Sequence, residues 1–503
     1  MPVQTEHDPR LKKTLKTRHL RMLALGGVIG AGLFVGSSAI ITEAGPGAFI
    51  TYGITGVLVF FVMRMLGEMA SAKPSTGSFT DYAGLALGRW AGFTTGWLYW
   101  YFWVIVVGFE AVVGGQIING WIPALPVWVI ALGLLVVMTA VNLLSVKSFG
   151  EAEYWFAGIK VAAILVFLIV GTLYVLHLWP GSTATFSNLT AAGGFLPNGA
   201  GTLFTGVVVV IFAMTGVEVV TIAAAESEEP GKNIRRAVNS VVFRILFFFV
   251  SSTLLIVIIR PWNTLTKGKS PFVSALETIG IPGASVALQA VILVAVLSVL
   301  NSGLYTSSRL LFVLGQRGDA PKWMHRVNRN GVPAAGVLAC TVIGYACVVI
   351  SAVSPDTVFL FLINSSGAVF LFVYLMICLS QIVLRRRWER DEPGIFQIKM
   401  WGYPWLPALV TLAIIAVLAS MAFSDDSDTR TSLYQSIIAW VVFLAIFLVR
   451  EALCRNSTRS TDPGTTDASL VAHEQGEIDA TAGGPTVPAT TATGATNSSA
   501  TSA

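Results

Sequence analysis

Charged side chains are scarce in this sequence: Asp, Glu, Lys and Arg make up 12% of its 503 residues, while 54% are hydrophobic. A soluble domain carries about a quarter charged residues. Apolar runs of about 20 residues recur along the chain, and each is long enough to cross a hydrocarbon layer about 30 Å thick. These features exclude a soluble enzyme and predict an all-α membrane protein.

Cysteine and histidine are also rare, and several functional motifs are missing. The four cysteines have no metal-binding spacing and no pair outside the membrane, so they predict neither a disulfide framework nor a metal site. The five histidines lie in termini, loops or span ends, which makes histidine a poor proton relay. The phosphate-binding pattern GxxxxGK[ST] is absent, which argues against an ATP-driven pump. We expect no cofactor, no metal and no enzymatic reaction, and the net charge of +5 reflects membrane topology and not nucleic-acid binding.

The apolar runs predict twelve transmembrane helices. They lie near residues 20–41, 47–70, 91–119, 124–144, 153–177, 201–225, 237–260, 284–314, 335–353, 357–384, 404–423 and 432–452. Residues 271–283 are moderately apolar but too short and proline-interrupted to cross. We expect a re-entrant or surface helix there.

Basic residues predict the orientation. With the N-terminus in the cytoplasm, only Arg260, Lys267, Lys269 and Arg430 of the 32 Lys and Arg residues fall outside, and Lys160 falls within a span. The remaining 27 lie on or near the cytoplasmic side, as the positive-inside rule requires. We therefore expect a multi-pass protein of the cell membrane with both termini in the cytoplasm.

Three regions follow from this topology. Residues 1–19 form a basic cytoplasmic N-terminus, which is no cleavable signal peptide because it leads into a full-length span without a small-residue cleavage site. Residues 20–455 form the twelve-helix domain. Residues 456–503 are rich in Thr, Ala, Ser and Gly, a composition that predicts a disordered tail.

Glycines interrupt the first predicted span. The segment GGVIGAGLFVGSS, residues 26–38, contains five glycines, and each costs a helix interior about 1 kcal/mol relative to alanine. The sixth span has a second interruption at Thr215 and Gly216, just before Glu218. Non-helical backbone at membrane depth is tolerated only where it is buried in protein or lines a polar cavity.

The two interruptions correspond if the chain contains an inverted repeat. Residues 20–177 and 201–384 would be two five-helix copies, with the helices of 404–452 appended. Paired breaks in corresponding helices point to a transporter's binding site. Position and hydropathy alone support this symmetry. The alternative is that the glycines only allow close helix packing.

Such breaks expose backbone groups that suit a zwitterion. A half-helix that begins near Gly32 presents unpaired N–H groups and a positive dipole end, which favour a carboxylate. A half-helix that ends near Val28 and Ile29, or near Phe212 and Ala213, presents carbonyl oxygens that favour an ammonium group. No arginine lies at mid-membrane in any predicted span.

Few ionisable residues lie within the predicted spans, where charge is costly and usually functional. Lys160, in the fifth span, could load and release a proton. Alternatively it could snorkel toward the cytoplasm, about 10 Å away at 1.5 Å per residue. Glu218 and Glu110 are candidate proton carriers too, or structural hydrogen-bonding groups. Arg64 and Glu68, spaced i, i+4, predict a salt bridge.

These motifs resemble those of amino acid permeases of the amino acid–polyamine–organocation superfamily. From about Thr17 to Ala452, the matching segments are GGVIGAGLFVGSS, AGPGA, MRMLGEMA, GSFTDYA, GRWAGF, GWLYWYFWV, NLLSVKSFGEAEYWFAGIK, VTIAAAESEEP, PWN, LNSGLYTSSR, RGDAP, NGVP and FLINSSGA. Within the family, EVVTIAAAES, NLLSVK and FLINSSGA are most similar to bacterial γ-aminobutyrate (GABA) permeases. Proline and aromatic permeases share much of these stretches.

The resemblance implies the five-plus-five inverted-repeat fold with helices 1 and 6 broken, and proton-coupled uptake by alternating access. Residues matched by motif would form the substrate site. The backbone of Gly30, Ala31, Gly32 and Leu33 would bind the carboxylate, and carbonyls near Ile29, Phe212 and Ala213 would take the amino group. Phe212 would also cover the substrate as a gate.

Further site residues follow from the same motifs. Thr215 and Gly216 belong to the second break, and Glu218 matches the family's acidic residue after it. Lys160 matches a family lysine that occupies a sodium-like position and helps couple transport to protons. Glu110 completes the set of proton-coupling candidates.

We expect a secondary active transporter in the lipid bilayer that imports a small zwitterionic amino acid with protons. GABA is the favoured substrate. A γ-amino acid separates its charges by two more methylenes than an α-amino acid. Its ammonium group would then need a more distant partner, such as Ser365 or Ser366 in the tenth span. The alternatives are a proline, aromatic or other α-amino acid permease, or an amino acid sensor on the same fold. A channel is disfavoured because paired breaks in one asymmetric chain do not make a symmetric filter.

Overall fold

The computed structural model describes residues 22, 29–75, 77–144, 146–219, 234, 238, 245–328, 331–353, 355–424 and 427–460. The description excludes the side chains of residues 146–149, 245–246, 351, 353, 355–367, 428 and 454–460. Over these ranges the structure consists of helices and turns, and it contains no strand. The chain divides into two units, residues 1–447 and 448–503.

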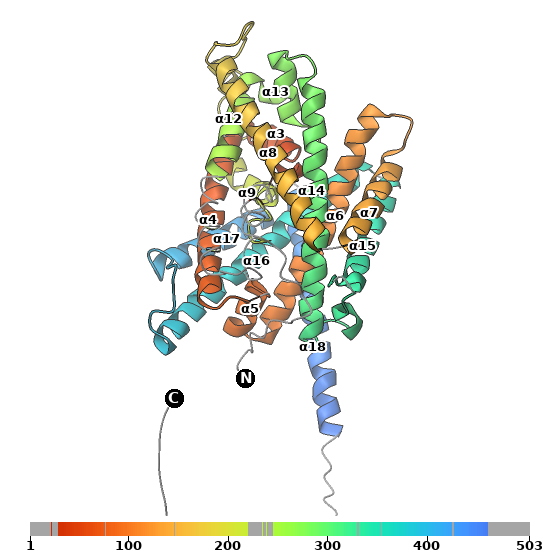
Figure 1. Ribbon diagram of the computed structural model, residues 1–503. Helices are drawn as coiled ribbons and strands as arrows, with labels where there is room; N and C mark the ends of the chain where they lie inside the picture. Colours follow the sequence, from red (N-terminus) through yellow and green to blue (C-terminus); the bar gives the residue numbers. More distant parts are fainter. Residues whose placement is uncertain are drawn as a thin grey trace, which may run out of the picture. The chain divides into compact units, whose positions relative to one another are not determined.

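Helices follow one another closely in the first part of the chain (Figure 1). They are α2 (Ala31–Phe34), α3 (Ser37–Ala44), the 3-10 turn η1 (Gly45–Gly47), α4 (Ala48–Ala72), α5 (Phe79–Leu87), α6 (Arg89–Trp121), α7 (Val127–Leu144), α8 (Val146–Val175) and η2 (Phe186–Leu189). Of these, α5 lies between the second and third predicted spans, and α8 begins seven residues before the fifth predicted span.

The second part of the chain is also helical. Its elements are α9 (Thr202–Ala213), the π-helical turn η3 (Ile245–Val250), α12 (Ser251–Ile259), η4 (Trp262–Thr264), α13 (Pro271–Ile279), α14 (Ala284–Gln316), η5 (Lys322–His325), α15 (Ala334–Val353), α16 (Pro355–Asp391), α17 (Trp405–Ala422) and α18 (Ser427–Ser460). The last helix crosses the boundary between the two units, so only its part up to residue 447 belongs to the first.

Each of the twelve predicted spans contains a described helix. Within the described ranges, eight helices are long and apolar enough to cross a membrane, and three shorter apolar helices lie at 202–213, 247–259 and 334–350. The all-helical class is therefore confirmed. The count of twelve crossings and the inverted repeat stay predictions.

The segment predicted as a re-entrant or surface helix is α13. Ser270 caps it by accepting a hydrogen bond from the Val273 N–H, Pro271 suits the first turn, and Gly280 ends it in the left-handed conformation. Its Phe272 is fully buried, with ring centroids 5.1 Å from Phe34 and 4.8 Å from Phe167. One face of α13 therefore packs inside the protein, against α2 and α8.

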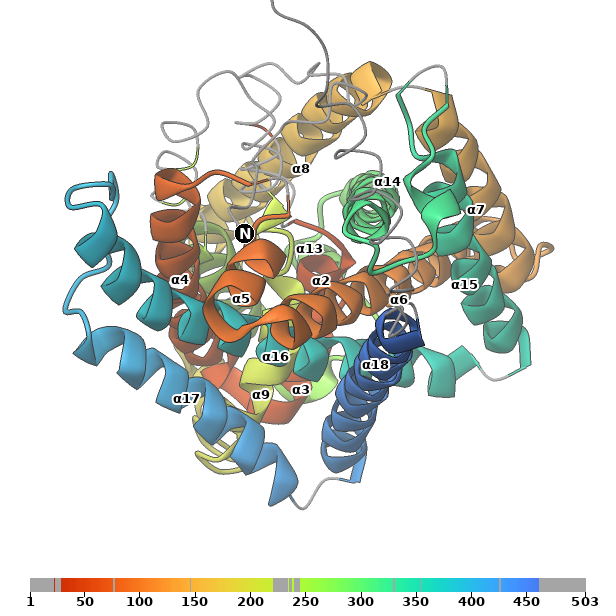
Figure 2. The same ribbon diagram turned by 90° about the horizontal axis from the view of Figure 1, so that it is seen from below.

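The centre of the first unit is occupied by α2, which contacts α9 and α14 (Figure 2). The long helices α6 and α14 pack along each other and carry much of the buried core. Large apolar side chains are exposed on outer helices, for example Val166 on α8 and Leu409 on α17. This is the surface expected of helices that face lipid.

Candidate functional site

The first predicted break is present at the start of α2. Gly30 is extended, with φ −136° and ψ −163°, and the helix begins at Ala31, one residue before the predicted position. It makes a single turn before Val35 and Gly36 interrupt it, and α3 starts at Ser37. Val28, the other predicted half-helix end, lies outside the described residues.

The second predicted break follows α9. The helix ends at Ala213, and residues 214–218 form turns. Gly216 has φ +98°, a conformation that favours glycine because it lacks a Cβ. The hydroxyl and the backbone N–H of Thr215 donate to the Phe212 carbonyl at 2.8 and 3.3 Å, so this carbonyl already has two partners.

The two breaks lie directly against each other. A Cβ placed on Gly32 would stand 2.7 Å from the Cα of Ala213, which is backbone and cannot yield. A Cβ on Gly30 would stand 2.6 Å from a methyl group of Val299 on α14 and 3.2 Å from Oε1 of Glu110. These glycines therefore serve close packing, and the same packing brings the interrupted backbone of α2 to that of α9.

Lys160 reaches the first break from α8. Its side chain is fully buried, and its Nζ donates a hydrogen bond to the Ile29 carbonyl at 2.9 Å. The same nitrogen lies 3.9 Å from Oε1 of Glu153. The ammonium group therefore does not extend to solvent, as snorkelling would require. It binds the backbone immediately before Gly30.

Glu110 reaches the same break from α6. Only 2% of the residue is exposed, and its carboxylate faces the backbone N–H of Ala31. Its Oε2 has no hydrogen-bond partner within the described part of the chain. A carboxylate thus already occupies the start of α2, where the sequence predicts the binding of a substrate carboxylate.

Glu218 and Phe212 are fixed by aromatic residues. The Tyr99 hydroxyl donates to Oε1 of Glu218 at 2.9 Å, and the Gly216 N–H lies 3.1 Å from both oxygens of that carboxylate. The ring of Phe212 packs edge-on against Phe109 at 5.1 Å between centroids. Glu218 therefore holds the second break in shape.

The remaining predicted residues divide into two groups. Ala31, Leu33 and Ala213 are buried at the two breaks. Ser365 and Ser366 lie within α16, and their side chains are outside the described residues.

Sequence reasoning missed Glu153 and Tyr99. Glu153 is seven residues before Lys160, which is two helical turns and the same face of α8. That spacing could have indicated the pair. No local pattern pointed to Tyr99, because its partner Glu218 is 119 residues away.

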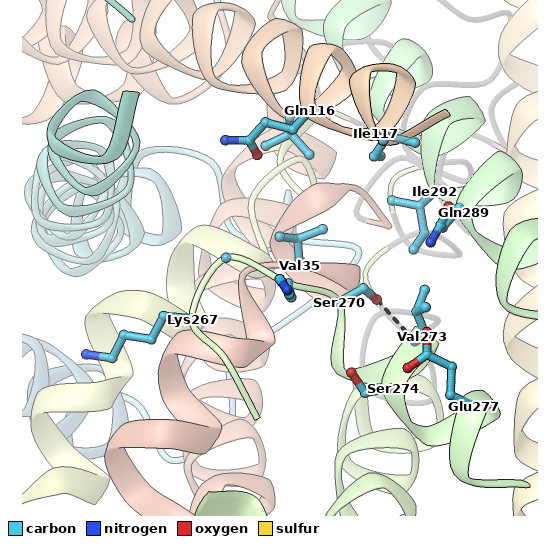
Figure 3. Close-up of a pocket in the computed structure, with 14 residues that line it drawn as sticks. Val35, Gln116, Ile117, Lys267, Ser270, Val273, Ser274, Glu277, Gln289 and Ile292 are labelled. Atoms are coloured by element: carbon cyan, nitrogen blue, oxygen red, sulfur yellow. Dashed lines mark hydrogen bonds between the residues drawn. The ribbon is translucent and has the colours of Figure 1, made fainter. Parts of the chain in front are cut away.

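A cavity of about 760 Å³ adjoins the end of α2 (Figure 3). Val35 lines it, together with Gln116 of α6, Gln289 of α14, Glu277 of α13 and the loop of residues 267–270. This space lies beside the first break. Across the described residues, no group of three or more His, Cys, Asp and Glu side chains could hold a metal ion.

Comparison with known proteins agrees with the motifs. A family model described as "Amino acid permease" matches residues 19–462. The "Gamma-aminobutyric acid permease" of Bacillus subtilis (strain 168) is 48% identical over 442 residues, which cover 88% of this chain and 94% of that protein. The "Gamma-aminobutyric acid permease" of Escherichia coli (strain K12) is 46% identical over 422 residues, or 84% of this chain and 90% of that one.

A solved structure also has a similar fold. The Eremococcus coleocola manganese transporter, crystallised with an aromatic bis-isothiourea substituted compound, matches with a TM-score of 0.52. The match covers 86% of this chain and 92% of that chain at 12% identity. At this identity the similarity concerns the fold alone.

Proposed function

Since this chain belongs to the amino acid permease family, we propose that it is a secondary active transporter that imports GABA by proton symport and alternating access. Relatives that carry the name of GABA permease are 46% and 48% identical over most of the chain, and they support this choice among amino acids. The protein would lie in the cell membrane with both termini in the cytoplasm. The observation that carries the proposal is the direct contact between the two breaks, Gly32 against Ala213.

The substrate would bind between these breaks. N–H groups in the first turn of a helix favour a carboxylate. At α2 the Leu33 N–H donates to the Gly30 carbonyl at 3.2 Å, and the Ala31 N–H faces Glu110. The substrate carboxylate would therefore bind at Gly32 or displace Glu110. Carbonyl oxygens at the end of α9 favour an ammonium group. The Phe212 carbonyl accepts from Thr215, so Ala213, with Ser365 or Ser366, is the better partner for the distant ammonium of a γ-amino acid.

Protonation would act on the first break through Lys160. A charged ammonium makes a hydrogen bond roughly twice as strong as a neutral donor does. While Lys160 is protonated, it holds the Ile29 carbonyl firmly, and loss of the proton would loosen the backbone beside Gly30. Glu110, which faces the Ala31 N–H at the same break, would sense this change.

The cavity beside Val35 would serve as the outer vestibule. Lys267 and Lys269 border it, and the predicted topology places both outside the cell, among the few basic residues on that side. Polar side chains from α6, α13 and α14 line the way from this side toward α2 (Figure 3).

Uptake into proteoliposomes tests the proposal. Purified protein would be given radiolabelled GABA under an inward proton gradient, with and without an uncoupler, and with excess unlabelled proline, phenylalanine or arginine. We expect accumulation that the uncoupler abolishes and the α-amino acids do not inhibit. Uptake of a competitor in place of GABA would overturn the substrate, and binding without any accumulation would favour the sensor alternative.

A further inference from the structure

We propose that Glu153 is a second proton-carrying residue, which takes the proton from Lys160 and passes it to a water-lined path along α14. This inference rests on the proposed proton symport. It names the residue through which the proton leaves the site and the side of the protein that it reaches.

Glu153 is buried beside Lys160, and only one of its two carboxylate oxygens accepts a hydrogen bond in the described part of the structure. It is 1% exposed, and its Oε1 lies 3.9 Å from the Lys160 ammonium and accepts a hydrogen bond from the Ser298 hydroxyl on α14. Its Oε2 has no hydrogen-bond partner among the residues that the structure describes. A buried polar atom without a partner is costly unless water satisfies it.

Hydroxyl groups continue from Glu153 along α14. Ser298, Ser302 and Thr306 are spaced four residues apart, so they share one face and follow one another at about 6 Å per step. The hydroxyls of Ser302 and Thr306 are buried, and neither donates to a backbone carbonyl in the described part of the structure. Ser302 faces the Glu153 carboxylate.

The hydroxyl of the neighbouring Ser307 is bonded differently from those of Ser302 and Thr306. Its hydroxyl donates to the Gly303 carbonyl at 2.6 Å, which is the ordinary way for a helix to satisfy a buried serine. Ser302 and Thr306 make no such bond. Buried hydroxyls in a row that do not bond to their own backbone are placed to hydrogen-bond the ordered water that the proposed path requires.

The row of hydroxyls leads toward the junction of α7 and α8. The amide of Asn142, two residues before α7 ends, donates to Asn301 at 2.8 Å. Beyond α14, Asn328 donates to the Leu143 carbonyl at 3.3 Å. The end of α7 therefore lies beside α14 at Asn301, next to the row of hydroxyls, and the proposed topology places this end on the cytoplasmic side.

The transfer is a simple proton exchange. The Lys160 ammonium gives one proton to the Glu153 carboxylate, so an N–H bond breaks, an O–H bond forms and both side chains become neutral. Glu153 then gives that proton to water beside Ser302 and regains its charge. Glu110 on α6 is the other carboxylate that acts on Lys160, and it lies at the break where substrate binds, so it would supply the proton while Glu153 removes it.

Glu153→Gln separates this role from a merely structural one. Three signals would be measured in proteoliposomes: exchange of labelled for unlabelled GABA without a gradient, gradient-driven accumulation, and acidification reported by a trapped pH-sensitive dye. We expect exchange within about twofold of wild type, with accumulation and acidification reduced at least about tenfold. Glu153→Asp should restore part of both, and Glu151→Gln on the same helix is the matched control.

Other results would overturn the proposal. If Glu153→Gln accumulates GABA and acidifies the lumen as wild type does, Glu153 carries no proton. If exchange falls in parallel with accumulation and Glu153→Asp restores neither, Glu153 only positions Lys160. Failure of the proposed function is distinct, because the wild-type protein itself would then exchange or bind GABA without moving protons.

Thr306→Val tests the path independently of Glu153. Valine keeps the shape of threonine and removes the hydroxyl. We expect acidification to slow several-fold while gradient-free exchange is unchanged, and Ser307→Ala, one residue further along α14, to have no effect on either. Equal acidification rates for wild type and Thr306→Val would overturn the path along α14.

Discussion

The Nζ atom of Lys160 lies 2.9 Å from the carbonyl oxygen of Ile29, so a fully buried cation on α8 is bonded to the backbone just before the first helix break. The two residues are 131 positions apart. This contact joins the proposed proton carrier to the segment that is proposed to bind the substrate carboxylate. It is the geometric basis for coupling in the proposed transporter.

Lys160→Arg should uncouple transport from protons. Arginine keeps the positive charge beside Glu153 and Ile29, but its guanidinium does not lose a proton in proteins. We expect gradient-driven accumulation of GABA to fall at least about tenfold, with measurable substrate binding. The measurement is uptake into proteoliposomes with and without uncoupler.

The control for this variant is Lys322→Arg, at an exposed residue of η5. It should behave as wild type. Uncoupler-sensitive accumulation by Lys160→Arg at the wild-type rate would contradict the role given to Lys160.

Gly32→Ala should abolish transport. The added methyl group would stand 2.7 Å from the Cα of Ala213, so α2 and α9 would have to separate where the substrate is proposed to bind. We expect uptake to fall about a hundredfold at equal protein levels, since a misplacement of about 1 Å at a site can cost that factor. Gly53→Ala on α4 is the matched control because nothing lies within 4 Å of its Cβ position. Normal uptake by Gly32→Ala would show that the two breaks tolerate separation.

Tyr99→Phe should slow transport without unfolding the protein. It removes the hydroxyl that donates to Glu218 at 2.9 Å and leaves the Gly216 N–H as a donor to that carboxylate. A hydrogen bond to a charged group is worth about 1.5–3 kcal/mol, so we expect a clear decrease in uptake rate. Tyr434→Phe, at an exposed tyrosine, should have no effect. An unchanged rate for Tyr99→Phe would mean that Glu218 does not depend on this bond.

Glu68→Gln should destabilise the fold more than it affects the site. The buried carboxylate of Glu68 accepts hydrogen bonds from Arg385, Gln381 and the Met400 N–H, the last at 2.7 Å. Breaking a buried ion pair by removing one partner costs about 3–5 kcal/mol. The free energy of unfolding, measured by denaturation in mixed detergent micelles, should fall by about that amount.

Glu392→Gln is the control for Glu68→Gln. Glu392 pairs with Lys73, and more than half of its side chain is exposed. A solvent-exposed pair contributes little to stability, so this variant should unfold as wild type does. Equal stability of the two variants would contradict the importance of the buried network.

The network around Glu68 marks a limit of reasoning from sequence. The i, i+4 spacing predicted a salt bridge with Arg64, and this is wrong. Glu68 pairs with Arg385 at 3.1 Å, while Arg64 binds the Lys399 carbonyl at 2.8 Å and lies 4.0 Å from the centre of the Trp401 ring. Glu68 and Arg64 each bind a residue more than 300 positions away in the sequence, and neither binds the other across one helical turn.

The local sequence determined where the helices form, where two of them break and which charged residues are candidates for function. Runs of apolar residues fixed the helices, because backbone groups in lipid must bond within their own segment. The glycines near residue 30 and the Thr215–Gly216 pair determined where the helices break. Glycine and threonine have low intrinsic helix propensity, and this does not depend on the packing of the helix. The scarcity of charge singled out Lys160, Glu110 and Glu218.

Tertiary structure alone decided what these elements do together. It placed Gly32 against Ala213, joined Lys160 to Ile29, and put the Glu110 carboxylate at the Ala31 N–H. It also gave Glu153 its Ser298 donor and Glu218 its Tyr99 donor. Each of these contacts joins segments distant in sequence, and its geometry depends on how whole helices pack, which no local pattern of residues contains.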